Sequence, residues 1–259
     1  MISGIFLIMS RTKKRLWVAI LIVGVGGLLA GKIYLMPSLS RYFLSRGNYY
    51  FNGGAYDLPK AEQFYRWALA IYDNTPLAHS KLANVLFIQG KPKEALVHID
   101  KEIAKNPDFG RAYYLRGLIY GFTKNLDEAE RDFKTILELQ ESSNKAQNLG
   151  EGGWAVYNDL AWIQFQKGNY ADVEKTAREG LTQYPDNPWL LNDLGLALLN
   201  LGKKGEAKAV FEKALVQAEK FTTQDVIKAY PGNDPAQASD RRLSIITNIR
   251  FNKTLTVDN

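Results

Sequence analysis

A short pattern of polar and apolar residues recurs along the chain. Glu-Ala occurs at 94–95, 128–129 and 206–207, and each alanine is followed four positions later by a bulky apolar residue. Because residues four apart lie on the same face of an α-helix, each occurrence predicts a helix that turns one small and one large residue toward a neighbour. The pattern therefore predicts a fold built from repeated helices.

The recurrence extends to whole units with a period of 34 residues, and self-similarity of this kind is the signature of a repeat architecture. The units start at Tyr42, Pro76, Gly110, Trp154 and Pro188. Small residues predominate at positions 8 and 20 and large ones at position 24, which lets two antiparallel helices pack closely. Position 8 holds Tyr49, Ala83, Gly117, Ala161 and Gly195, position 20 holds Ala61, Ala95, Ala129, Val173 and Ala207, and position 24 holds Tyr65, Ile99, Phe133, Ala177 and Phe211.

Glycine and proline mark the ends of the expected helices. Gly90, Gly168 and Gly202 occupy position 15 of their units, where a left-handed residue ends the first helix. Pro107 and Pro185 occupy position 32, where proline stops the second helix. Two helices of about a dozen residues with short turns fit within one unit.

This pattern resembles the tetratricopeptide repeat (TPR) family. The resemblance covers residues 42–221 and implies an all-α fold, an α-solenoid of about five TPR helix pairs. Unit one has Tyr49 at a position that is usually small, so its first helix is expected to pack differently. Units three and four start 44 residues apart, and the extra residues fall within 141–153. We expect a long second helix in unit three and then a glycine-rich loop, which is either a tolerated insertion or a partner contact.

Residues 222–259 are expected to form a C-terminal capping helix and a tail, because the open end of a solenoid exposes apolar surface. A further helix is predicted to start at Asp234-Pro235, with aspartate as N-cap and proline at the first helical position. Its apolar positions either dock onto the end of the solenoid or associate with lipid or a partner. These positions are Leu243, Ile246, Ile249 and Phe251.

The segment Leu16–Met36 is predicted to be a transmembrane helix. Its 21 residues carry one charge, Lys32, and as a helix they would extend about 31 Å, close to the roughly 30 Å hydrocarbon core of a bilayer. A cleaved signal peptide is the competing interpretation, but a cleavage site with small residues is poorly supported. Basic residues crowd residues 1–15, so this short N-terminus is expected in the cytoplasm and the solenoid in the extracytoplasmic or periplasmic space.

Further expectations concern this anchor. Gly27 and Gly31 form a small-xxx-small pair that would allow a homodimer contact in the membrane. Only Pro37 to Arg41 separates the anchor from unit one, so partners are expected near the cytoplasmic (inner) membrane. Either Met1 or Met9 can be the start of translation.

The net charge of +6 is concentrated near the N-terminus. The first 36 residues hold five basic and no acidic side chains, which leaves 28 basic and 27 acidic residues for the rest. A nucleic-acid partner is therefore not expected. The chain has no cysteine, and its two histidines match no metal spacing. No catalytic residue, metal or cofactor is predicted, because no catalytic motif is present.

The TPR resemblance implies a concave groove lined by the first helices. Its aromatic, amide and basic side chains suit an extended peptide or a helix of a partner, although Trp162 and Phe165 could instead pack between helices. We expect a scaffold or adaptor that supports assembly of an envelope or membrane complex. The alternatives are a chaperone-like holdase for translocated chains or a non-catalytic subunit of an enzyme complex. The groove residues are Arg46, Tyr50, Asn84, Arg111, Tyr114, Leu118, Asn158, Trp162, Phe165 and Asn192.

Overall fold

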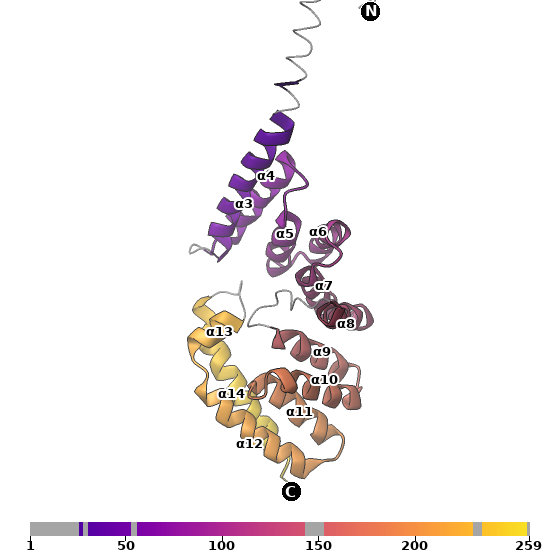
Figure 1. Ribbon diagram of the computed structural model, residues 1–259. Helices are drawn as coiled ribbons and strands as arrows, with labels where there is room; N and C mark the ends of the chain where they lie inside the picture. Colours follow the sequence, from indigo (N-terminus) through magenta and orange to yellow (C-terminus); the bar gives the residue numbers. More distant parts are fainter. Residues whose placement is uncertain (1–25, 28–30, 53–55, 143–152, 230–234, 258–259) are drawn as a thin grey trace, which may run out of the picture.

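The computed structural model describes residues 26–27, 31–52, 56–142, 153–229 and 235–257, and its regular secondary structure in these ranges is helical. Helix pairs follow one another along a curved array, which confirms the predicted all-α architecture of repeated helix pairs (Figure 1). The pairs are α3 (Met36–Asn52) with α4 (Leu58–Ile71), α5 (Ala78–Ile88) with α6 (Pro92–Lys105), α7 (Gly110–Phe122) with α8 (Leu126–Ser142), α9 (Trp154–Gln166) with α10 (Tyr170–Gln183), and α11 (Pro188–Asn200) with α12 (Lys204–Lys220).

Close packing of small against large residues joins the two helices of a pair. A Cβ atom added to Gly117 would lie 2.9 Å from Cε1 of Phe133, and one added to Gly195 would lie 2.5 Å from Cε1 of Phe211. Both phenylalanines are almost completely buried. The glycines therefore provide the space that the rings fill, which is the reason for the recurring small and large positions.

The turns between paired helices have the left-handed residue that the sequence predicts. Gly90, Gly168 and Gly202 have φ angles of 76°, 79° and 77°, a conformation that glycine adopts without steric cost. In the third pair this place is taken by Lys124, with a φ of 65°. Left-handed backbone costs a residue with a Cβ atom roughly 1–2 kcal/mol, so the α7–α8 turn is the least relaxed of these four.

Salt bridges connect successive pairs along the second helices. Lys91 Nζ lies 2.9 Å from Oε2 of Glu62, and Lys203 Nζ lies 2.9 Å from Oε2 of Glu174. In both cases the lysine belongs to a turn and the glutamate to the second helix of the preceding pair. Exposed ion pairs contribute at most about 1 kcal/mol each, so they favour the register between pairs rather than hold the array together.

The first pair differs from the expected unit. Helix α3 begins at Met36 rather than near Tyr42, so Pro37 to Arg41 are helical. The small residue that receives Tyr65 is Gly47, where a Cβ atom would lie 2.4 Å from Cε1 of the tyrosine ring. Tyr49, the residue assigned to this position, is 48% exposed. The assignment was wrong because the segment between the two helices is two residues longer in this pair than in the others.

The predicted membrane segment 16–36 lies mostly outside the described residues. Among the residues that are described, no helix combines the length and the apolar character needed to cross a bilayer. The end of the segment is visible as a π-helix, η1 (Gly31–Leu35), which continues directly into α3. A Cβ atom at Gly27 would meet nothing within 4 Å. The membrane span and the homodimer contact at Gly27 and Gly31 stay predictions.

The insertion after the third pair is described only at its edges. Helix α8 has 17 residues, whereas the second helices α6 and α10 have 14. The second helix of this unit is therefore longer than α6 and α10, as expected, and equal in length to α12. The glycine-rich part predicted to follow it, 143–152, lies outside the described residues.

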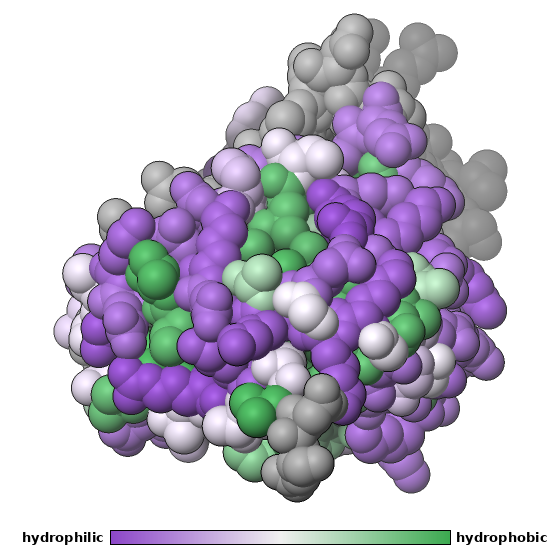
Figure 2. Space-filling model, turned by 90° about the horizontal axis from the view of Figure 1, so that it is seen from below, coloured by the Kyte–Doolittle hydropathy of each residue, from purple (hydrophilic) through white to green (hydrophobic). Residues whose placement is uncertain are grey.

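The C-terminal helices cover the end of the array. They are α13 (Thr223–Ala229), the short 3-10 helix η3 (Pro235–Gln237) and α14 (Ala238–Thr254), which packs against α12. Ile246 and Ile249 are buried there with Ile245, whereas Leu243 and Phe251 are 55% and 62% exposed. Seen from this lower end of Figure 1, hydrophilic residues cover most of the surface, with apolar patches between them (Figure 2). Of the two roles considered for this helix, docking onto the solenoid is the one observed.

Two histidines form a buried pair between α5 and α6. His79 is 1% exposed, and its Nδ1 lies 3.0 Å from Nδ1 of His98. Burial, together with the charge of the nearby Lys105, lowers the pKa of His79 to about 4. Burial likewise lowers the pKa of His98. His79 therefore packs in the protein interior as a neutral ring beside the half-buried His98.

Acid is expected to weaken the fold through His79. Its pKa of about 4 in the folded chain lies below the ordinary value of 6.5, so between these pH values the unfolded chain binds the proton more readily. The free energy of unfolding should therefore fall with pH across this window, by up to about 3 kcal/mol at about 1.4 kcal/mol per pKa unit. Urea unfolding across the window measures this loss for wild type and for His79→Gln, which lacks the titrating ring. Parallel curves for the two proteins would contradict the assignment.

Candidate binding groove

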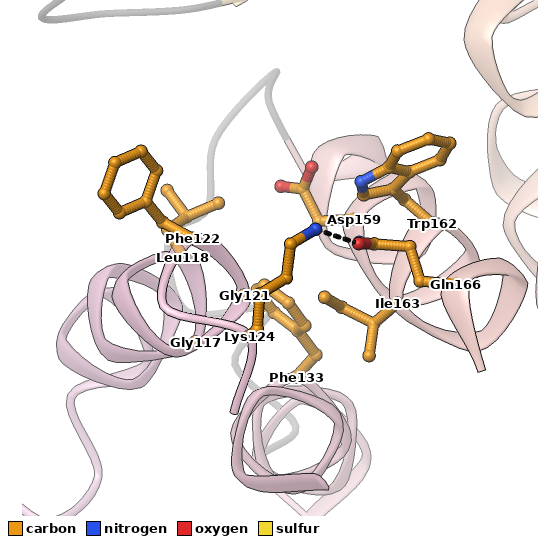
Figure 3. A pocket seen from close by; sticks show the side chains of 10 residues that line it. All are labelled: Gly117, Leu118, Gly121, Phe122, Lys124, Phe133, Asp159, Trp162, Ile163 and Gln166. Atoms are coloured by element: carbon orange, nitrogen blue, oxygen red, sulfur yellow. Dashed lines mark hydrogen bonds between the residues drawn. The ribbon is translucent and has the colours of Figure 1, made fainter. Parts of the chain in front are cut away.

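The first helices of successive pairs lie side by side on the inner side of the curve. Contacts join α5 to α7, α7 to α9 and α9 to α11 (Figure 1). A pocket of about 440 Å³ opens where α7, α8 and α9 meet (Figure 3). It is lined by Gly117, Leu118, Gly121, Phe122, Lys124, Phe133, Asp159, Trp162, Ile163 and Gln166.

Two small residues on α7 create the space for this pocket. Gly117 and Gly121 are one helical turn apart, and a Cβ atom at Gly121 would lie 3.0 Å from Cδ1 of Ile163. The base of the pocket includes the buried residues Phe133 and Ile163. A larger residue at Gly117 would therefore press on the Phe133 ring of α8, and one at Gly121 would press on Ile163 of α9.

Exposed aromatic residues stand on two sides of the pocket. Phe122, at the end of α7, is 66% exposed, and Trp162, on α9, is 52% exposed (Figure 3). The Trp162 ring stacks on Phe165, with centroids 5.9 Å apart and an interplanar angle of 6°. Phe165 in turn contacts Tyr170 edge to face. Trp162 thus combines a fixed orientation with a free face, which favours contact with a partner.

A hydrogen bond crosses the pocket at its polar edge. Lys124 Nζ donates to Oε1 of Gln166 at 2.6 Å, which joins the α7–α8 turn to α9 (Figure 3). The left-handed conformation of Lys124 places its side chain in the pocket lining. The lysine and the glutamine are both exposed enough to change partners when a ligand enters.

Asp159 contributes an acidic group to the pocket lining. Tyr114 donates its hydroxyl proton to Oδ2 of Asp159 at 2.6 Å, and Asn158 Nδ2 lies 3.4 Å from Oδ1. Burial nevertheless raises the pKa of Asp159 to about 6, since the two hydrogen bonds only partly offset the loss of hydration. The carboxyl therefore releases its proton just below neutral pH.

A second buried acid, Asp193, occupies the corresponding place on α11. Its side chain is 9% exposed, and Oδ2 has no hydrogen-bond partner among the described residues. Burial raises the pKa of Asp193 well above its ordinary value, and the charge of Asp159 raises it further. The two acids are 34 residues apart and lie on α9 and α11, which contact each other.

Five of the ten predicted groove residues gather around this region. Trp162 and Leu118 line the pocket, Phe165 supports Trp162, and Tyr114 and Asn158 bond Asp159. Trp162 and Phe165 were expected either to line the groove or to pack between helices. Trp162 faces the groove, whereas Phe165 is half-buried beside it.

The other predicted residues lie apart from the pocket. Asn192 on α11 accepts a hydrogen bond from Asn252 of α14 at 2.9 Å, so the C-terminal helix already contacts it. Arg111 is exposed at the start of α7, and Asn84 is half-buried on α5.

Arg46 and Tyr50 belong to an aromatic cluster at the N-terminal end of the array. The Arg46 guanidinium lies 5.5 Å from the ring centroids of Tyr49 and Tyr50 and 5.8 Å from that of Phe64. Tyr50 stacks on Phe64 with centroids 5.4 Å apart. The two extra residues between α3 and α4 shift the register of α3, and this turns both side chains toward α4 instead of the pocket.

Sequence reasoning missed the two acids and Phe122. Asn-Asp occurs at 158–159 and at 192–193, at the same place in two successive units, and this repetition was the available signal. A polar residue in the first helix of a repeat is usually solvated, so sequence gave no reason to expect burial of these carboxyl groups.

Comparison with known proteins supports the assignment of the repeats. The tetratricopeptide repeat profile matches residues 110–143 and 190–216. Human tetratricopeptide repeat protein 16 is 25% identical over 135 residues, which are 51% of this chain and only 16% of that protein. The crystal structure of PilW, a widely conserved type IV pilus biogenesis factor, superposes with a TM-score of 0.60 at 14% identity and covers 83% of this chain and 91% of its own.

A second solved structure has the same fold. YrrB, a TPR protein with an unusual peptide-binding site, superposes with a TM-score of 0.50 at 16% identity, over 74% of this chain and 95% of its own. Protein and peptide binding is typical of TPR domains, and TPR proteins are usually non-catalytic scaffolds. From its recurring small and large positions, its helix pairs and these matches, the chain has a TPR-like array of helix pairs, and its residues 110–143 and 190–216 match the tetratricopeptide repeat.

Proposed function

We propose that this chain is a membrane-anchored scaffold or adaptor that binds a peptide or helix of a partner in its groove. The pocket between α7 and α9 carries this proposal, because Phe122 and Trp162 expose large aromatic faces beside it. Such anchors supply much of the binding energy in protein interfaces. YrrB, which has the same fold, is a peptide-binding TPR protein, and this supports the choice of ligand class.

The proposed location follows from the sequence of the N-terminal segment. We infer that residues 16–36 span the cytoplasmic membrane, with the N-terminus in the cytoplasm and the helix pairs in the extracytoplasmic or periplasmic space. The partner would then be membrane-proximal, and the chain would support assembly of an envelope complex. PilW, whose fold is similar, is a pilus biogenesis factor.

Removal of the Trp162 ring is expected to weaken partner binding strongly. Trp162→Ala should lower recovery of the partner by roughly 30-fold, which corresponds to about 2 kcal/mol for an aromatic anchor. Helicity should change little, because the ring is 52% exposed. The measurement is crosslinking of the full chain in native membranes, followed by quantitative identification of the captured proteins.

A matched control tests whether the effect is specific to the groove. Val97, on the second helix α6, is 56% exposed, and Val97→Ala should leave recovery unchanged. Equal recovery with Trp162→Ala and wild type would contradict binding at the pocket. One stoichiometric partner supports the scaffold, whereas a broad set of unfolded clients supports the holdase alternative.

The orientation in the membrane has its own test. We expect the C-terminus to lie outside the cytoplasm, so a reporter that works only outside the cytoplasm should be active when it is fused after Asn259. Activity of a reporter that works only inside the cytoplasm would overturn the proposed topology. This result would leave the assignment of the groove unaffected.

A further inference from the structure

The acidic pair of the groove has an unmet electrostatic requirement. Asp159 lines the pocket, and Asp193 is nine-tenths buried with Oδ2 unpartnered. Among the described residues, neither carboxyl group has an ion-pair partner: Asp159 bonds only Tyr114 and Asn158. A buried charge is costly unless it is paired, so a ligand with a positive charge would be bound more favourably here than in water.

We propose that the groove recognises an arginine side chain of the partner, with its guanidinium held between the Trp162 ring and the carboxyl group of Asp159. This inference rests on the proposed function, because it names the chemistry of the ligand that the groove binds. Asp193 is the corresponding acid on the neighbouring first helix, α11, which contacts α9.

Arginine fits the arrangement better than lysine does. Its planar guanidinium stacks on aromatic faces and donates several hydrogen bonds in one plane. Trp162 offers one ring face, because Phe165 covers the other. A lysine ammonium would reach the carboxyl group but would make less use of the ring.

The surrounding charges are consistent with a cationic ligand. Lys124, the one basic residue in the pocket lining, donates to Gln166. On the other side, α14 contributes Asn252, which bonds Asn192 of α11. Among the described residues, neither of these two hydrogen bonds involves the Asp159 carboxyl group, which lines the pocket.

The experiment uses a defined probe and the full chain in detergent micelles. The probe is a short capped peptide with a central arginine, and its matched control has citrulline, which has a similar shape without the charge. Tryptophan residues are replaced by fluorotryptophan, and the fluorine resonance of Trp162 is identified by its loss in Trp162→Phe. The arginine peptide is expected to shift this resonance and to bind at least about tenfold more tightly than the citrulline peptide.

Variants of the acids test the assignment directly. The double variant Asp159→Asn, Asp193→Asn should bind the arginine peptide only as tightly as the citrulline peptide. The control variant Asp108→Asn, at an exposed turn, should bind the arginine peptide with unchanged affinity. Equal binding of the two peptides, or full affinity in the double variant, would overturn the inference. If partner recovery depends on Trp162 but not on the acids, the groove function holds and the arginine assignment fails.

Discussion

Phe211→Ala is expected to lower the free energy of unfolding by about 3–5 kcal/mol, the usual cost of emptying a fully buried phenylalanine site. Phe211 on α12 is completely buried and shares a cluster with Leu194, Leu198 and Ile249. It also fills the space beside Gly195. Its loss therefore removes a side chain that residues of α11 and α14 share as a packing partner. Urea unfolding followed by circular dichroism measures the change.

Two further variants make this expectation specific. Val216, on the same helix, is 54% exposed, and Val216→Ala should change stability by less than about 0.5 kcal/mol. Gly195→Ala should destabilise the protein by about 1–3 kcal/mol because the new methyl group meets the Phe211 ring. Combined with Phe211→Ala, its cost should be smaller, since the ring is gone. Additive losses would show that the two residues do not share this space.

Asp193→Asn is expected to stabilise the protein by about 1–3 kcal/mol near pH 8, because it removes a carboxyl group whose charged form is disfavoured by burial. Burial and the charge of Asp159 raise the pKa of Asp193, so the folded chain holds this proton more tightly than the unfolded chain does. Such a carboxyl group stabilises the fold fully only below its unfolded pKa, and this contribution is lost as the pH rises through the folded value. The advantage of the variant should therefore shrink toward acid.

The pKa of Asp159 defines the pH range over which its protonation changes the free energy of unfolding. Its pKa is raised from 3.8 to about 6, so its contribution is lost between these pH values. Urea unfolding of wild type, Asp159→Asn and Asp193→Asn across this range measures the difference. Asp108→Asn, which removes an exposed charge, should run parallel to wild type. If the Asp193→Asn curve also ran parallel to wild type, the buried acid would have no energetic cost.

Residues in contact within a helix pair were the ones that sequence predicted well. Ala129 and Phe133 could be placed because the same small and large positions recur in other units and have one packing solution. Gly47 was missed because two additional residues before Ala61 break the spacing on which that reasoning depends.

The acids of the groove could not be predicted for a different reason. Burial of Asp159 and Asp193 results from the approach of α7, α9 and α11, which is a property of the stacked pairs. Within one unit each acid is simply a polar residue on a helix. Trp162 could be selected from sequence because the TPR resemblance assigns its position to the inner face. The exposure of its free ring face is known only from the structure.

The direct continuation of η1 into α3 has a mechanical consequence. The backbone is continuously helical from 31 to 52, so the direction in which the groove faces is fixed relative to the start of η1. Each residue of an α-helix advances about 1.5 Å and turns about 100°. One residue inserted into this stretch would re-aim the groove about the α3 axis, and a full turn of inserted residues would restore its direction at a greater height. In the proposed membrane-anchored arrangement, the helical phase of α3 would determine which neighbour the groove can reach.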